Sequence, residues 1–414
     1  MSEWLESELN KIGNIVSGGT PDTSISKFWD GEILFITPFD LSRTKSAFIE
    51  NSERKISKEG LENSSANLLP IGSIVVSSRA PIGYIAVAKK EFTTNQGCKS
   101  IVPNSNYDSL YFYYCLNFYV ERIKRLGAGS TFAEISKSDL ELIKFPHPKD
   151  KTEQCQIAKI LSTADAVIEK TQAAIDKYKA IKQGMLHDLF TRGIVTEPTT
   201  YIDKTGKVVE LCRNQLRPTY EDAPELYKES KLGWFPKEWE VKPLVDIAVI
   251  HNGIDYKRNP PGQEIPIYGT GGIMGFTSVS LNNGPAVLTG RKGSINRPIY
   301  IEGEFWNVDT IFCLKPKEKT NTKWLYYNIL LTDMNKYNEA TGVPSIASKT
   351  LYKLNFCHYD IEEQNKIIEF ITPIENTLQA EESSLLKLKQ LKIGLMGDLL
   401  SGKKKVIVKE EEMA

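Results

Sequence analysis

The chain has 414 residues, with 52 basic and 52 acidic side chains and a formal net charge of zero. This length suggests two or three domains, and 41% hydrophobic with 10% aromatic residues is enough for folded cores, which excludes an intrinsically disordered chain. Neutral charge gives no global sign of a polyanionic partner, so a nucleic-acid-binding protein of this composition needs local basic surfaces.

The cysteine and histidine residues show no pattern typical of a metal site or a disulfide framework. The six cysteines stand far apart without a C-x-x-C pair, and the four histidines form no ligand-spaced cluster with them. The N-terminal segment lacks the basic start and apolar core of a signal peptide, and no apolar run approaches ~18 residues. We therefore expect a soluble protein of the reducing cytoplasm.

Residues 1–150 predict a globular α/β domain with a mixed, partly irregular sheet. A β-rich run leads to Arg79, a glycine-containing turn follows, and a later strand ends at Pro103. An aromatic helical segment begins at Leu110. The order of the strands does not follow from the sequence.

Residues 151–192 predict one long helix. Mostly apolar side chains recur here in steps of three and four residues, which places them on one stripe and is typical of a helix that packs along another helix. They are Ile157, Leu161, Ala164, Ile168, Thr171, Ile175 and Tyr178. At ~1.5 Å per residue, roughly 39 residues make a rod of about 58 Å.

Residues 193–238 are rich in proline, threonine and charge, and predict an extended connector with a small turn at 204–207. Aromatic residues punctuate it, and we expect them to lie against a surface. They are Tyr220, Tyr227 and Trp234, followed by Trp239 directly after the connector.

Residues 239–360 predict a second globular domain that repeats the layout of the first. The pattern of Trp4, Leu9 and Ile12 returns as Trp239, Leu244 and Ile247, and Arg291 takes the place of Arg79. Such a loose repeat indicates two related but divergent domains.

Residues 361–402 predict a second long helix, and residues 403–414 a solvated tail. The segment 152–190 recurs without a gap 210 residues later as 362–400, so that Lys182, for example, returns as Lys392. Two copies of one helix indicate an internal pseudo-two-fold repeat. Pro373 should kink the second helix or delay its regular start.

Motifs for catalysis are absent or incomplete. Asn259–Gly262 resembles the Asn-Pro-Pro-aromatic loop of amino-methyltransferases, but a glycine stands where a ring must stack on the target base, so we interpret it as a proline-rich turn. The glycine-rich segment 269–275 leads into a strand rather than a helix, which leaves a tight turn or a backbone close to a partner as alternatives. The lack of complete catalytic motifs favours a protein that recognises a partner over one that catalyses a reaction.

The chain resembles the specificity subunit of type I restriction–modification systems over nearly its whole length. The resemblance rests on specific phrases taken together. They are SGGTPDTS at 17–24, FWDGEILFITPFDL at 28–41, SSRAPIGYIAV at 77–87, TNQGCKSI at 94–101, KQGMLHDLFTRG at 182–193, and the connector phrase LRPTYEDAPELYKES with LGWFPKEWE.

This resemblance implies two target recognition domains with mixed β-sheets, separated by two long antiparallel coiled-coil helices. Each domain is expected to read one half of an asymmetric, bipartite site in double-stranded DNA. The implied partners are two modification (methyltransferase) subunits, which carry S-adenosylmethionine, and two restriction (motor-nuclease) subunits, which use ATP and Mg²⁺, in a full restriction complex. The chain itself is expected to bind no cofactor, metal or membrane and to catalyse nothing.

Direct readout of base edges needs arginine, lysine, asparagine or glutamine on loops, with further donors to phosphates. Our candidates in the first domain are Thr37, Arg43, Lys45, Ser78, Arg79, Asn95 and Gln96. In the second domain they are Tyr256, Lys257, Arg258, Tyr268, Thr289, Arg291, Lys292, Asn296 and Arg297. The matching places of Arg79 and Arg291 are equally compatible with a structural salt bridge.

Two other functions remain open at this point. A self-sufficient DNA methyltransferase would need the cofactor loop and stacking residue that the sequence lacks. A coiled-coil scaffold without DNA specificity agrees with the zero net charge, but it gives no reason for two divergent domains with arginine and glycine in their loops.

Overall fold

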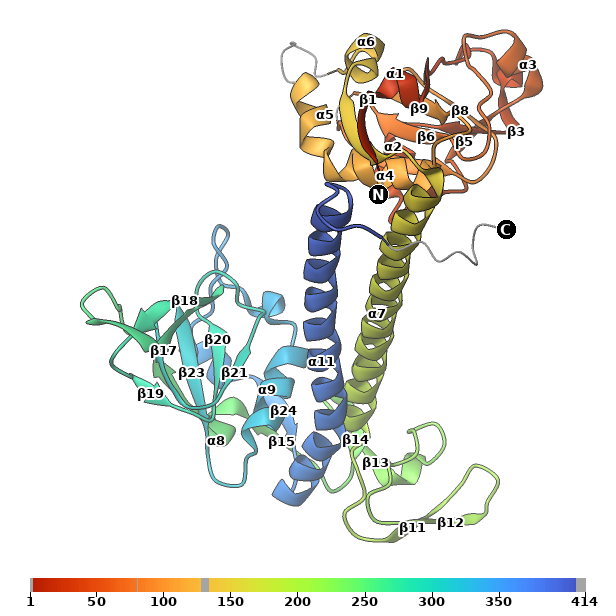
Figure 1. Ribbon diagram of the computed structural model, residues 1–414. Helices are drawn as coiled ribbons and strands as arrows, with labels where there is room; N and C mark the ends of the chain where they lie inside the picture. Colours follow the sequence, from red (N-terminus) through yellow and green to blue (C-terminus); the bar gives the residue numbers. More distant parts are fainter. Residues whose placement is uncertain (1–2, 80, 128–133, 407–414) are drawn as a thin grey trace. The chain divides into compact units, whose positions relative to one another are not determined.

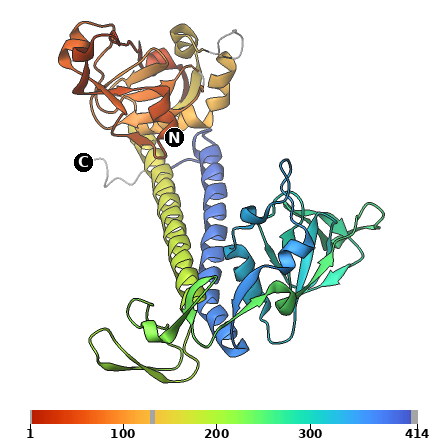
Figure 2. The same ribbon diagram turned by 180° about the vertical axis from the view of Figure 1, so that it is seen from behind.

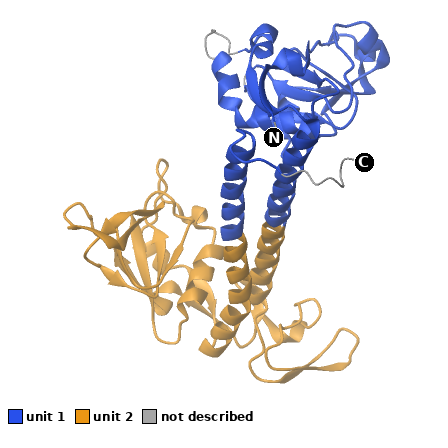
Figure 3. Ribbon diagram, viewed as in Figure 1, with its two compact units in different colours: residues 1–173, 382–414 blue, residues 174–381 orange. Residues whose placement is uncertain are grey.

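The computed structural model describes residues 3–79, 81–127 and 134–406. These form two compact units (Figure 3): unit 1 contains residues 1–173 and 382–414, and unit 2 contains residues 174–381. Each unit combines one globular domain with part of both long helices. Ala80, within one of the family phrases, and residues 407–414 of the expected tail lie outside the described residues.

The globular domain of unit 1 is built from short strands and short helices. In chain order its elements are β1 (Trp4–Glu8), α1 (Leu9–Ile12), β2 (Gly13–Ser17), η1 (Ser26–Phe28), β3 (Trp29–Ile36), α2 (Pro38–Arg43), β4 (Phe48–Ile49), β5 (Arg54–Ile56), α3 (Lys58–Glu62), β6 (Ile74–Ser77), β7 (Ile85–Ala88), β8 (Phe92–Thr94), β9 (Cys98–Pro103), α4 (Ser109–Phe118), α5 (Val120–Leu126), α6 (Lys137–Glu141) and β10 (Lys144–Pro148). The strands form a sheet in the order β2-β9-β6-β7-β4, a smaller sheet β5-β3-β8, and the pair β1-β10.

The globular domain of unit 2 repeats this arrangement. Its elements are β15 (Glu240–Pro243), α8 (Leu244–Ile247), β16 (Ala248–Asn252), β17 (Pro261–Gly269), β18 (Gly272–Thr277), β19 (Asn282–Asn283), β20 (Ala286–Gly290), β21 (Ile299–Ile301), β22 (Glu304–Asn307), β23 (Ile311–Pro316), α9 (Thr322–Leu331), η3 (Met334–Tyr337), α10 (Ser348–Tyr352) and β24 (Asn355–His358). Its sheets are β16-β23-β20-β21 and β18-β17-β22-β19, with the pair β15-β24.

The strand order β2-β9-β6-β7 of unit 1 returns as β16-β23-β20-β21 in unit 2, and β5-β3-β8 returns as β18-β17-β22, which confirms the repeat expected from the sequence, while β4 and β19 extend only one sheet each. In both, the second sheet is mixed, because β3 runs parallel to β8 and β17 runs parallel to β22 while their other partners are antiparallel. The main sheets contain long-range antiparallel pairs such as β2 with β9 and β16 with β23. The expectation of mixed sheets is confirmed, and the structure supplies the strand order.

The two long helices are α7 (Lys151–Thr191) and α11 (Ile361–Leu399), where helices were expected at 151–192 and 361–402, so the second helix ends three residues earlier than expected. In unit 1 the N-terminal part of α7 lies beside the C-terminal part of α11, and in unit 2 the relation is reversed, so the helices are antiparallel within each unit (Figure 1). The start of α11 at Ile361 shows that Pro373 does not delay the helix; α11 continues through this residue.

The core of each unit joins its globular domain to the helices. In unit 1, Tyr111 and Phe112 of α4 pack in one cluster with Ile157 and Leu161 of α7 and with Leu399. In unit 2, residues of α9 form a corresponding cluster with α7 and α11. Its members from these helices include Leu186, Leu189, Trp324, Leu325, Ile367 and Ile371. The heptad stripe thus serves both the helix pair and the attachment of a domain.

The connector is more ordered than the sequence indicates. It contains the hairpin β11 (Thr199–Ile202) with β12 (Val208–Leu211), the turn η2 (Pro224–Leu226), and the hairpin β13 (Tyr227–Ser230) with β14 (Gly233–Pro236). The expected turn closes the first hairpin, with Gly206 at φ +83°. Figure 2 shows the connector beside the C-terminal end of α7. In the part of the chain that the structure describes, no helix is long and apolar enough to cross a membrane.

Candidate nucleic-acid interface

Several loops of unit 1 meet around Gly97 at the end of the sheet. The N–H groups of Ser78 and Arg79 both donate to the carbonyl oxygen of Gly97, at 2.8 and 3.3 Å. A Cβ atom on Gly97 would lie 2.9 Å from Cγ of Pro38, so the loop before α2 also packs closely here. The hydroxyl of Thr20 donates to Oε1 of Gln96 at 2.6 Å, which adds the loop after β2. We call this set of loops the first loop face.

The candidate residues of unit 1 have different positions on this face. Gln96 and Arg43 are exposed, and Arg43 lies over the ring of Phe39 with its Cζ atom 4.9 Å from the ring centroid. Lys45 is exposed just after α2. Thr37 instead caps α2, because its hydroxyl and N–H both contact Oδ2 of Asp40, and Asn95 accepts a bond from the N–H of Gly97 at 3.0 Å.

Arg79 is held by a salt bridge. Its Nε atom lies 3.0 Å from Oε2 of Glu134, and the ammonium group of Lys99 lies 3.8 Å from the other oxygen of the same carboxylate. Lys99 is buried, and burial lowers the pKa of its ammonium group while Glu134 acts in the opposite direction. The structural role that the sequence left open for Arg79 is thus present, although half of its side chain remains exposed.

Unit 2 has an equivalent loop face. The N–H groups of Arg291 and Lys292 both donate to the carbonyl oxygen of Thr310, at 2.9 and 3.0 Å, as the N–H groups of Ser78 and Arg79 do to Gly97 in unit 1. The N–H of Gly293 donates to Pro344, and a Cβ atom on Gly293 would lie 3.0 Å from the hydroxyl of Thr270 in the β17–β18 turn. We call these loops, together with residues 253–259, the second loop face.

The candidates on the second loop face are mainly exposed cations. Lys257 and Arg258 are exposed ahead of β17, beside the half-buried Tyr256, and Tyr268 is half-buried near the end of β17. Lys292, Asn296 and Arg297 are exposed in the loop between β20 and β21. Arg291 is exposed as well, but its Nη1 atom donates to the carbonyl oxygen of Asp309 at 3.3 Å. In this backbone pattern Arg291 takes the place of Ser78 and Lys292 that of Arg79, so the matching of Arg79 with Arg291 expected from the sequence is wrong by one residue.

Two candidates do not occupy the exposed loop positions that we expected. Ser78 is 1% exposed directly after β6, and Thr289 is 0% exposed within β20. Both hydroxyl groups are buried without a hydrogen-bond partner among the described residues. Neither can reach a base edge in this conformation, because the β-rich runs around them form the inner strands of the main sheets.

The two segments that resemble incomplete functional motifs, Asn259–Gly262 and residues 269–275, form turns and parts of strands. Asn259 follows a tight turn in which its N–H donates to the carbonyl oxygen of Tyr256 at 2.8 Å, and Pro261 begins β17. The glycine-rich segment forms the turn of the antiparallel β17–β18 hairpin, with Gly272 at φ +109°. The first motif thus begins at a turn, as interpreted, but its second half, Pro261 and Gly262, belongs to β17.

Comparisons with known proteins agree with this geometry. The family model for the type I restriction modification DNA specificity domain matches residues 1–177 and 236–390, one match in each half of the chain. The chain belongs to this family.

Relatives of the specificity-subunit type cover different shares of the chain. The MjaIX specificity subunit of Methanocaldococcus jannaschii is 35% identical over 265 residues, which are 64% of this chain and 55% of the relative, so the match spans about half of that protein. The MjaVIII specificity subunit of the same organism is 25% identical over 78% of this chain and 77% of its own length. The S subunit of a type I system from M. genitalium shares the fold, with a TM-score of 0.62, 17% identity and 96% of each chain covered.

The specificity domain of unit 1 is anchored to the long helices by a tyrosine, a carboxylate and a lysine. The hydroxyl of Tyr114 in α4 donates to Oδ2 of Asp165 in α7 at 2.7 Å, and Lys392 of α11 forms an ion pair with the same carboxylate. Lys392 also lies 5.6 Å from the centroid of the Tyr114 ring. One carboxylate thus connects a domain to both helices.

The specificity domain of unit 2 has the same anchor. Tyr327 of α9 donates to Oε1 of Glu375 in α11, and Lys182 of α7 lies 2.8 Å from that oxygen and 5.3 Å from the tyrosine ring centroid. Burial raises the pKa of Glu375, but the hydrogen bonds from Lys182 and Tyr327 outweigh it and hold the pKa below the usual 4.5.

A buried glutamine near the start of each long helix makes a second repeated contact. Gln154 accepts from the N–H of Asp108 at 2.9 Å and donates to the carbonyl oxygen of Pro148 at 2.9 Å. Its copy Gln364 accepts from the N–H of Asn321 at 2.9 Å and donates to the carbonyl oxygen of Tyr359 at 2.7 Å. Asp108 and Asn321 are the N-caps of α4 and α9, so the glutamines fix where each domain helix begins.

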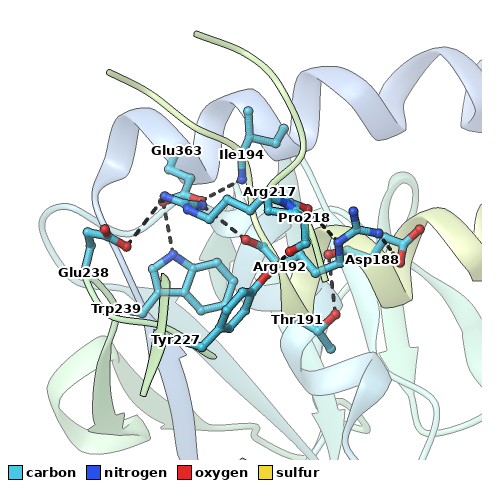
Figure 4. A network of polar contacts seen from close by, with 10 residues as sticks. All are labelled: Asp188, Thr191, Arg192, Ile194, Arg217, Pro218, Tyr227, Glu238, Trp239 and Glu363. Carbon is cyan, nitrogen blue, oxygen red and sulfur yellow. Dashed lines mark hydrogen bonds and ion pairs between the residues drawn. The ribbon is translucent and has the colours of Figure 1, made fainter. Parts of the chain in front are cut away.

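The residue before each glutamine is a buried glutamate, and in unit 2 it organises a network (Figure 4). Glu363 lies 2.5 Å from Nη1 of Arg217 in the connector, accepts from the N–H of Ile194 at 2.8 Å, and accepts from Nε1 of Trp239 at 3.1 Å. The connector is therefore tied to α11 and to the start of the specificity domain.

Sequence reasoning missed Glu134, Lys99, Arg217 and the exposed Ile273 and Met274 of β18. The repeat offered one signal, since Glu153 and Glu363 return in register at buried positions, which indicates a shared structural role. Arg217 gave no signal, because it is 146 residues from its partner and lies outside the repeat.

Proposed function

We propose that this chain is the non-catalytic DNA sequence-recognition subunit of a type I restriction–modification complex. The observation that carries the proposal is the pair of loop faces, which use the same backbone pattern around Gly97 and Thr310 but carry different side chains. Equal scaffolds with different surfaces suit the two unequal halves of a bipartite DNA site.

The exposed cations of each loop face supply what DNA binding needs. Arg43 and Lys45 on the first face, and Lys257, Arg258 and Lys292 on the second, can neutralise phosphates and set the register on the duplex. Gln96 offers an amide for base edges. The exposed side chains of Ile273 and Met274 suit contact with thymine methyl groups.

We further propose that two modification subunits dock on the long helices, as the family resemblance implies. Large apolar side chains are exposed on these helices in both units. They are Val167, Leu386, Leu391 and Ile393 in unit 1, and Ile181 and Phe370 in unit 2. Leu386 and Ile393 are seven residues apart and so lie on one face of α11, where exposed apolar side chains fit a helix from another subunit. The partners would bring S-adenosylmethionine for adenine methylation, and restriction subunits would bring ATP and Mg²⁺.

The connector is a second candidate docking surface. Tyr220 stacks on Trp234 with ring centroids 4.3 Å apart, and Trp234 is 44% exposed. Trp234→Ala should weaken assembly with a modification subunit without unfolding the chain, since Trp234 is not part of the buried core. Unchanged assembly would remove this surface from the proposal.

Methylome sequencing tests the function. A methylation-deficient host would express the modification subunit with or without this chain. Methyl-adenine at one split DNA motif, present only with this chain, is the expected result. Absence of a new mark from a complex that assembles would favour a scaffold without DNA specificity.

A further inference from the structure

The N-terminal turn of α7 contains a buried carboxylate whose charge is not compensated within the described structure. Glu153 is 3% exposed, and its Oε1 atom has no hydrogen-bond partner among the described residues. An ionised carboxylate is costly to bury unless it is paired. This position therefore suggests a cationic partner group.

Unit 2 shows which group fills the same position. Glu363, the repeat copy of Glu153, is also 3% exposed and binds the guanidinium group of Arg217, which reaches it from the connector. The part of the connector that carries Arg217 has no repeat copy in the described part of unit 1, and no described residue of unit 1 forms an ion pair with Glu153.

The other parts of the unit 2 network have counterparts in unit 1. Trp4, the repeat copy of Trp239, has a buried Nε1 atom without a partner among the described residues, whereas Nε1 of Trp239 donates to Glu363. Gly402 stands against Trp4, where a Cβ atom would lie 3.0 Å from Cδ2, as Gly193 stands against Trp239. Both glycines have positive φ, +73° and +64°. Unit 1 thus keeps the carboxylate, the indole and the close turn.

We propose that Glu153 and Trp4 form a receptor for an arginine side chain carried by an extended segment of a partner polypeptide. The guanidinium would pair with the carboxylate of Glu153 as that of Arg217 does with Glu363, and arginine suits a planar carboxylate better than lysine because its donors form a fixed fork. Of the three lysines that follow α11, Lys404 is paired with Asp398 at 3.0 Å, and Lys403 and Lys405 are exposed. The proposal is independent of DNA recognition.

The first test compares matched substitutions in the full-length chain. Glu153→Gln removes a charge that has no partner in the free chain, so it should raise Tm, whereas Glu363→Gln removes a paired charge and should lower Tm. If Glu153→Gln lowers Tm as much as Glu363→Gln, the chain fills the site itself and the proposal is overturned. A truncated chain that ends at Val406 tests whether residues 407–414 supply the partner of Glu153. If Glu153→Gln lowers Tm in the full-length chain but not in the truncated chain, the site is filled by residues 407–414.

The second test measures binding in trans. A synthetic peptide with the sequence of residues 212–220 would be added to full-length chain labelled with 5-fluorotryptophan, and the Trp4 resonance assigned with Trp4→Phe. The peptide should shift that resonance, and at least tenfold less affinity is expected for Glu153→Gln chain or for a peptide carrying Arg217→Gln. No shift at millimolar peptide, or an equal shift with the Arg217→Gln peptide, would overturn the proposal.

Discussion

Replacing Arg217 by methionine tests how far unit 2 depends on one buried ion pair. Arg217 is 7% exposed and Glu363 is 3% exposed, so the pair is shielded from water. Methionine keeps most of the apolar volume but leaves the carboxylate without a countercharge. The carboxylate still accepts from the N–H of Ile194 and from Trp239, at 2.8 and 3.1 Å.

Breaking a buried pair by removing one partner typically costs about 3–5 kcal/mol. The two remaining donors place the expected loss of unfolding free energy for Arg217→Met near the lower end, at about 3 kcal/mol. At roughly 2–4 °C per kcal/mol for a domain of this size, Tm should fall by about 6–12 °C. Adding Glu363→Gln removes the buried charge and keeps an acceptor for Trp239, so the double variant should lose only about 1 kcal/mol.

Guanidinium denaturation followed by circular dichroism would measure the two single variants and the double variant as a cycle. The double variant should be more stable than Arg217→Met alone. The reasoning from charge burial is refuted if Arg217→Met lowers the unfolding free energy by less than about 1 kcal/mol, or if the effects of the two substitutions on this free energy are additive. In either case the loss does not come from the unpaired carboxylate of Glu363.

Three further outcomes are expected. Tyr114→Phe and Tyr327→Phe each remove a hydrogen bond to a carboxylate and should cost similar amounts, about 1.5–3 kcal/mol, in denaturation curves; a loss for one and none for the other would contradict the equivalence of the two anchors. The pKa of Glu375 is lowered in the folded chain, so its ion pair stabilises unit 2 above pH 4.5, and this contribution is lost as the pH falls further. The Tm values of wild-type and Glu375→Gln chains should therefore differ at neutral pH and converge at acidic pH. If Arg79 contacts DNA, Arg79→Ala should weaken binding of the assembled complex to the first half-site by ~1–3 kcal/mol while Glu134→Gln should not, whereas equal effects of both would assign the arginine to loop structure alone.

The sequence was most informative where structure depends on local spacing. The predicted helices 151–192 and 361–402 agree with α7 and α11 at both starts and to within one and three residues at the ends, because a helix pattern is carried by neighbours three and four positions apart. The Trp-Leu-Ile phrase likewise marked the opening of each domain, where β1 with α1 and β15 with α8 are found. These elements needed no knowledge of distant partners.

Long-range pairing was beyond sequence reasoning. The parallel pairing of β3 with β8 joins segments far apart in the chain, and no local pattern specifies it. The same limit explains the errors at Ser78 and Thr289, whose burial depends on which strands flank β6 and β20. The hairpins of the connector were missed because its apolar residues are few and its strands short. Which exposed side chains touch DNA stays a prediction.

The repeated anchor also bears on how such a chain can change over generations. Each specificity domain is held by a tyrosine in its first long helix and by a backbone N–H at that helix's N-cap, while the partner groups, Gln154 with Asp165 and Gln364 with Glu375, belong to the spacer helices. Recombination can therefore replace one specificity domain by another that has the same tyrosine and N-cap, with no change in the loops of the new domain. Modularity of this kind allows a new recognition surface to arise in one exchange, with the scaffold left intact.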